Sequence, residues 1–80
     1  MKVEEVRTAM QTRPFRQFVL HLSGDESVRV PHPEHLLFLR DNRTVIVAGD
    51  EGGHSVIDLD LVTRLEVGSP THTVGEPGTA

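Results

Sequence analysis

Apolar and polar residues alternate in short runs along the chain, and the longest apolar runs lie between residues 36 and 47. Residues 36–39 are four apolar side chains in succession and residues 45–47 are three, with a polar turn between them. Because side chains alternate between the two faces of a strand, four in a row predict that both faces of this strand are covered. We therefore expect a central hairpin of residues 36–40 and 44–48.

The opening segment has the spacing of a short amphipathic helix over residues 2–12. Val3, Val6 and Met10 fall on one face, and two acidic residues lie in the first turn, where they suit the helix dipole. Pro14 ends the helix. A helix of this length does not persist unaided, so we expect it to pack on the strands that follow.

The remaining elements are short strands and turns. Phe18, Leu20 and Leu22 share one face of the first strand, and we expect Leu65 and Val67 to point inward from the last. Prolines on either side of His32 interrupt strand pairing and predict a corner. The further strands are expected at residues 15–22, 27–30, 54–58 and 63–67, with a single 3₁₀ turn at 59–62.

These elements predict a mainly β fold with an N-terminal helix, closed as a small barrel of five to six strands. One domain is expected over residues 1–67. From Gly68 onward the composition shifts to Ser, Pro, Thr and Gly, and only Val74 is apolar. Residues 68–80 are therefore expected to form a disordered polar tail, because they cannot bury enough surface to offset their ordering entropy.

The composition bears on nucleic-acid binding and on the role of the arginines. The chain of 80 residues carries a net charge of -4 and has no Cys, Trp or Tyr. Nucleic-acid binders usually show a basic excess and aromatic stacking groups, so the charge disfavours that role. Seven of the eight basic residues are arginines, which we expect to pair with the abundant acids across the sheet faces.

The lack of long apolar runs bears on the cellular location of the protein. No apolar run approaches the roughly 18 residues that a membrane helix needs. The first ten residues are charged and have no apolar segment typical of a signal peptide. We therefore expect a cytoplasmic protein without membrane contact.

His32 and His35 are metal candidates by their spacing, within the run His-Pro-Glu-His. Pro33 argues against a helix here, and on an extended corner the two imidazoles would point apart. His21 and His54 lie elsewhere in the sequence, and no spacing requires them to join the pair. We therefore expect a structural corner with no metal and no cofactor.

Catalytic chemistry has little support in the sequence. No hydroxyl residue lies in a strained elbow between a strand and a helix, as a nucleophile would require. Asp58 and Asp60 are two residues apart and are expected to cap the 3₁₀ turn rather than act as an acid–base pair. A domain of this size also has little room for a deep pocket. We do not expect an enzyme.

Three segments resemble a group of small bacterial proteins. They are residues 13–18 (RPFRQF), residues 30–34 (VPHPE) and residues 57–67 (IDLDLVTRLEV). Members of that group open with a short helix and a PFRPF-like run, carry an HP(E/D) corner and close on IDLLLVT-LEV. The resemblance covers roughly residues 1–67 and departs at Gln17, where the group usually has a second proline. It implies no activity.

A looser resemblance concerns architecture. A helix, several strands, a single 3₁₀ turn and a closing strand are similar to the Sm-like and SH3-like small barrels, and residues 57–66 are similar to the ending of many such domains. Those barrels bind RNA, peptides or each other, often as rings. The Sm signature for RNA binding has no clear equivalent here, so the resemblance supports the fold more than a function.

The central hairpin is the strongest functional signal. One helix covers only part of a second face, so we expect the remainder to be buried against another copy, through a strand edge or the outer face of the hairpin. The interaction residues we predict are Leu37, Leu39, Ile46, Arg40 and Arg43. The favoured function is a non-catalytic module that self-associates and docks a protein partner; the alternative is an Sm-like RNA-binding protein.

Overall fold

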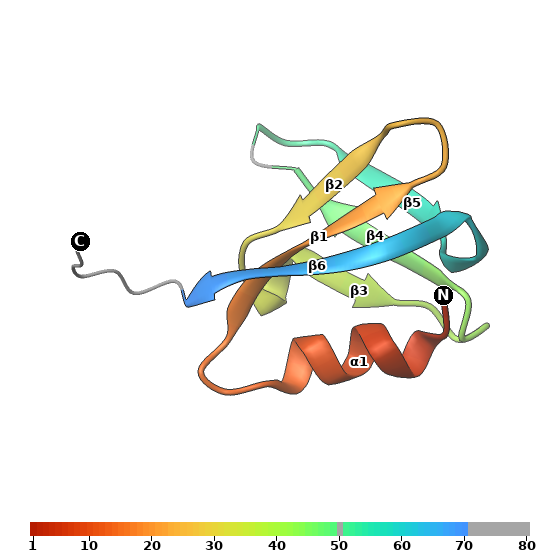
Figure 1. Cartoon of the computed structure of the whole chain (residues 1–80). Coiled ribbons are helices and arrows are strands. Elements are labelled where there is room, and N and C mark those ends of the chain that lie inside the picture. The colour runs from red at the N-terminus through yellow and green to blue at the C-terminus, as the bar shows by residue number, and fades with distance from the viewer. Residues whose placement is uncertain (50, 71–80) are drawn as a thin grey trace.

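A computed structural model describes residues 1–49 and 51–70 of the chain. The predicted mainly β fold with one N-terminal helix is confirmed (Figure 1). The elements are α1 Val3–Gln11, β1 Arg16–Leu22, β2 Ser27–Val30, β3 Leu36–Phe38, β4 Thr44–Ala48, β5 His54–Asp58 and β6 Val62–Pro70, with single 3₁₀ turns η1 Pro33–His35 and η2 Leu59–Leu61.

The strands form two open antiparallel sheets. One has the order β2-β1-β6 and the other the order β3-β4-β5. The predicted closed barrel is not shown, because strand pairing among the described residues does not join the two sheets. The corner at Pro31 and η1 carries the chain from the first sheet to the second, and η2 carries it back.

One apolar core lies between the sheets. Phe18, Leu20 and Val30 enter it from the first sheet, and Val45 and Ile57 enter it from the second; all are almost inaccessible to solvent. The inward alternation predicted for β1 is therefore confirmed at Phe18 and Leu20. Leu22 is only partly buried and packs against the core.

Helix α1 closes one side of this core. Figure 1 shows it lying along the side of the sheets where β3 and β6 run. Its buried residues are Val3 and Val6, as the spacing predicts. The Arg7 guanidinium lies over the Phe38 ring at 4.7 Å, which attaches the helix to β3. Arg13 donates to the carbonyls of Met10 and Thr12 just past the last turn of the helix.

Within the single chain only one face of the Leu36–Leu39 run is covered, and burial of the other face against a second copy stays a prediction. Leu36 is buried and Phe38 is partly buried, but Leu37 is 60% exposed and Leu39 is 36% exposed. The reason is the position of α1, which adds Val3 and Val6 to the core between the sheets and leaves the outer face of β3 uncovered.

Strand β6 also departs from expectation. Val67 is opposite Phe18 in register, which places it on the inward face as predicted, but it is 51% exposed. β6 is an edge strand with a neighbour on one flank only, so Val67 is open to solvent there. The strand continues to Pro70, three residues beyond the predicted end of the domain at residue 67. The rest of the predicted tail, residues 71–80, lies outside the described residues.

Candidate interaction surface

The outer face of the β3-β4-β5 sheet carries a continuous apolar row. Leu37 is directly opposite Ile46, and Ile46 is directly opposite Val56. Residues opposite one another across antiparallel strands share a face. Leu37 is 60% exposed, Val56 is 63% exposed and Ile46 is partly exposed, so the row faces solvent across all three strands.

The alternation of β4 explains why this row faces outward. Val45 and Val47 are buried in the core, so Ile46 between them must point to the other side. The same argument applies in β5, where Ile57 is buried and Val56 is not. The sequence has apolar residues on both faces of these strands, but only one face has a covering layer.

The structure brings together the apolar residues predicted for interaction. Leu39 lies beside the row. Its backbone N–H donates to the Thr44 carbonyl at 3.0 Å, so the pairing of the hairpin continues to this residue. Leu39 is two residues from Leu37, so the two side chains lie on the same face. Val56 belongs to the same surface and was missed by sequence reasoning. The signal that finds it is the strand alternation of residues 54–58 combined with the register of β4 and β5, and the register is not visible in the sequence.

Of the two predicted arginines, Arg43 is held in place beside the row, next to the Thr44–Asp58 pair. Its guanidinium donates to both carboxylate oxygens of Asp58, at 3.0 to 3.3 Å, and lies 3.5 Å from an Asp60 oxygen. These hydrogen bonds lower the pKa of Asp58 below its ordinary value of 3.8. Arg40 is exposed and makes no hydrogen bond or ion pair with another described residue.

The turn between β3 and β4 is ordered by Asp41. Its carboxylate accepts hydrogen bonds from the Thr44 hydroxyl at 2.6 Å and from the backbone N–H groups of Arg43 and Thr44, each at 2.9 Å. The Thr44 hydroxyl is the largest cause of a lowered pKa at Asp41. Asn42, in the middle of the turn, adopts a positive φ of 58°, which Asn tolerates better than most residues. Asp58 caps η2 by accepting from the Asp60 N–H, as expected.

The two candidate metal ligands lie closer together than expected. Because Pro33 starts the 3₁₀ turn η1, His32 and His35 approach with ring centroids 5.7 Å apart instead of pointing away from each other. A metal site in a protein generally needs further ligands, and no group of three such donors occurs among residues 1–49 and 51–70.

His21 lies in a separate charged network on the outer face of the first sheet. Its Nε2 is 2.8 Å from Glu66 Oε1 and 3.0 Å from Arg64 Nη2. The hydrogen bond with His21, followed by the positive charge of Arg64, lowers the pKa of Glu66. The network joins β1 to β6 and leaves His21 away from η1.

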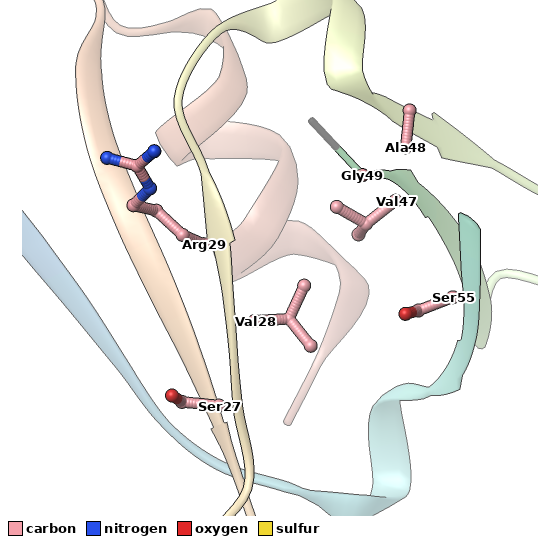
Figure 2. Close-up of a pocket in the computed structure, with 7 residues that line it drawn as sticks. All are labelled: Ser27, Val28, Arg29, Val47, Ala48, Gly49 and Ser55. Atoms are coloured by element: carbon pink, nitrogen blue, oxygen red, sulfur yellow. The ribbon is translucent and has the colours of Figure 1, made fainter. Parts of the chain in front are cut away.

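A cavity of about 290 Å³ opens between β2 and the facing sheet (Figure 2). Val28 and Val47 point into it, and the Ser55 hydroxyl lies at its edge, whereas Arg29 points away. The lining is completed by Ser27, Ala48 and Gly49. The side chains directed into this space are apolar or hydroxyl groups, without a base to activate a hydroxyl.

Comparisons with protein-family models, with curated proteins and with solved structures found no significant match to the chain. Among the described residues there is also no helix of the length and hydrophobicity needed to cross a bilayer. The support for the candidate surface therefore comes from the geometry of the chain alone.

Proposed function

We propose that the chain is a non-catalytic interaction module that associates with copies of itself and docks a protein partner on the outer face of β3-β4-β5. The observation that carries this proposal is the exposed row of Leu37, Ile46 and Val56, with Leu39 beside it. Single exposed apolar residues are common on protein surfaces, whereas a contiguous row on one face is typical of an interaction site.

The surroundings of the row fit a protein interface. Thr44 and Asp58 flank the row on one side, and Ala48 and His54 flank it on the other, according to the strand register. An apolar centre with a polar rim is the usual organisation of protein–protein contacts. The bidentate pair of Arg43 with Asp58 also fixes the rim in place before any partner binds.

RNA binding, the alternative function, has less support. Arg43 and Arg64 are bonded to carboxylates, Arg13 to main-chain carbonyls, and Arg7 lies on an aromatic ring. These arginines come from different elements and are occupied locally. An RNA-binding surface requires a cluster of cations that is directed at phosphates.

We also propose that the architecture is related to the SH3-like and Sm-like small barrels. Support comes from the leading helix, from two three-stranded sheets packed over one core, and from the 3₁₀ turn η2 between β5 and β6. Such folds are used for binding in many different ways, so the likeness is compatible with an interaction module without naming its partner.

Self-association is the directly testable part of this function. We expect the mass of the full chain, measured by light scattering on a sizing column, to rise with concentration. Val56→Thr removes apolar surface at the end of the row and should weaken association roughly threefold to tenfold. Leu61→Thr is the matched control, because Leu61 is 53% exposed on η2 and lies outside the row.

A mass that stays monomeric from micromolar to millimolar concentration would refute the self-association. If Val56→Thr and Leu61→Thr weaken the association equally, the copies do not associate through the row. Retention of the wild-type chain on RNA at low salt, lost as salt rises, would favour the alternative function instead.

A further inference from the structure

Strand β5 is an open edge of its sheet. It pairs with β4 on one flank, and the other flank has no strand beside it among the described residues. The pairing with β4 is regular over the whole of β5, from His54 to Asp58, with no bulge. Residues 54–58 contain neither proline nor lysine, which are common devices that keep strand edges apart.

The backbone groups that face this open flank can be identified. The Gly49 N–H donates to the Gly53 carbonyl at 3.1 Å, which makes these two residues a hydrogen-bonded pair. Hydrogen-bonded pairs alternate along an antiparallel ladder, so Ser55 and Ile57 also bond to β4. The N–H and C=O groups of the alternate residues, 54, 56 and 58, therefore point away from β4.

Among the described residues, no hydrogen-bond partner lies on this flank for the N–H and C=O groups of His54 and Val56 or for the N–H of Asp58. The Asp58 carbonyl accepts the first hydrogen bond of the 3₁₀ turn η2. The other edges are less suited to pairing. β3 has only three residues, β2 has four and is followed by Pro31, and β6 has register shifts at two points. β5 is thus the regular edge that presents donors and acceptors in a straight line.

We infer that two copies of the chain pair through β5, antiparallel and about a two-fold axis at Val56. This inference rests on the proposed function and names the contact by which the copies meet. Val56 is then opposite Val56 of the second copy, and the two exchange both backbone hydrogen bonds. A two-fold contact of this kind is closed and self-complementary, so it gives a dimer.

Donor–acceptor complementarity supports a second copy as the occupant of this edge. Antiparallel pairing about Val56 puts His54 directly opposite Asp58 of the second copy, and the same pair recurs on the other side of the axis. Hydrogen bonds between facing cross-strand side chains stabilise a sheet, and like charges destabilise it. The His54 imidazole supplies an N–H donor, and the Asp58 carboxylate is an acceptor. Asp58 is held as a carboxylate by Arg43.

The apolar row supports the same arrangement. Val56 is the end of the row on the β5 side, so pairing at β5 joins the rows of the two copies into one. A row of three side chains is small beside the roughly 800 Å² per partner of a stable interface. Backbone pairing adds the contacts that the row alone lacks, and it leaves a joined apolar face of twice the length for a protein partner.

Amide hydrogen exchange tests this pairing by its pattern along one strand. In the wild-type chain, the amides of His54, Val56 and Asp58 should exchange more slowly as concentration rises through the dissociation constant, roughly tenfold or more at the highest concentration. The amides of Ser55 and Ile57 already bond to β4, so association should change their exchange rates less.

Two variants extend the test. Val56→Pro removes an outward N–H without breaking a bond to β4, and should abolish the dimer. His54→Asp places carboxylates opposite each other, and should weaken it roughly tenfold.

The outcomes separate this inference from the proposed function. A wild-type chain that remains monomeric refutes both. A chain that associates without slowing exchange at residues 54, 56 and 58 keeps the module and overturns the β5 contact. If folded Val56→Pro still forms the oligomer and Leu37→Thr does not, the contact lies on the sheet face and not at the β5 edge. A mass above that of a dimer would also overturn the two-fold pairing.

Discussion

At the scale of single residues, Asp41 shows what sequence reasoning can and cannot find. A polar turn between apolar runs is visible in the sequence, and so is the tolerance of Asn42 for a positive φ. The sequence does not show that the Asp41 carboxylate collects hydrogen bonds from Thr44 and from two backbone amides. The same limit applies to Arg43, predicted as an interaction residue, whose guanidinium is engaged by Asp58 within the chain.

Asp41, Asp58 and Glu66 predict how stability depends on pH. Each has a pKa below its ordinary value because its ionised form accepts hydrogen bonds in the fold. Their contribution is fully present above the ordinary pKa and is lost as the pH falls through the folded pKa. We expect the melting temperature to fall as the pH is lowered from about 5 to about 2.

Asp41→Asn should lower the melting temperature at pH 6 and make its decline on acidification shallower than in the wild-type chain. Glu26→Gln is the control, since the Glu26 side chain makes no hydrogen bond with the described residues. Parallel pH profiles for wild type and Asp41→Asn, measured by circular dichroism, would show that this carboxylate contributes nothing to the pH dependence.

At the scale of elements, alternation predicted the strands well but not their surroundings. The helix, five of the strand segments and the 3₁₀ turn η2 lie close to their expected residues. Which face of the central hairpin is covered depends on where α1 packs, and a helix pattern does not specify its partner. Sequence reasoning misses the turn η1. Pro33 argues against a helix at this corner, but proline suits the first position of a short helical turn.

Val6 tests the packing of α1. It is fully buried between the helix and the sheets, and Val6→Ala removes two methyl groups from the core. We expect a loss of about 2 kcal/mol in the free energy of unfolding, measured with urea. Leu61→Ala, at an exposed position, should change it by less than about 0.5 kcal/mol. A similar small effect for both variants would mean that α1 does not stabilise the sheets.

At the scale of the whole molecule, the two sheets and α1 share one core. Buried residues from all three belong to a single cluster, so neither sheet has an apolar interior of its own. The sequence predicted one mainly β domain but not the division into two open sheets, because strand order depends on register. The apolar excess of the hairpin predicts a contact region there, while the row and the β5 edge become visible only with the pairing of the strands.

The shared core predicts that the described domain unfolds as one unit. Amides of β1 and of β4 should lose protection at the same denaturant concentration. Phe18→Ala, which empties the centre of the core from the first sheet, should destabilise both strands equally by about 3–5 kcal/mol. Separate transitions for β1 and β4 in exchange measurements would show that the sheets fold independently.

The apolar outer face affects how reliably the strands pair in the correct register. In β4, Val45, Ile46 and Val47 are all apolar, so sliding this strand by one position swaps its two faces at little hydrophobic cost. The burial pattern therefore does not protect the alignment, and the Asp41 turn must do so. Making Ile46 polar would guard against such slippage but would also erase the contact row, so accuracy of folding and capacity to associate are in direct conflict at this position.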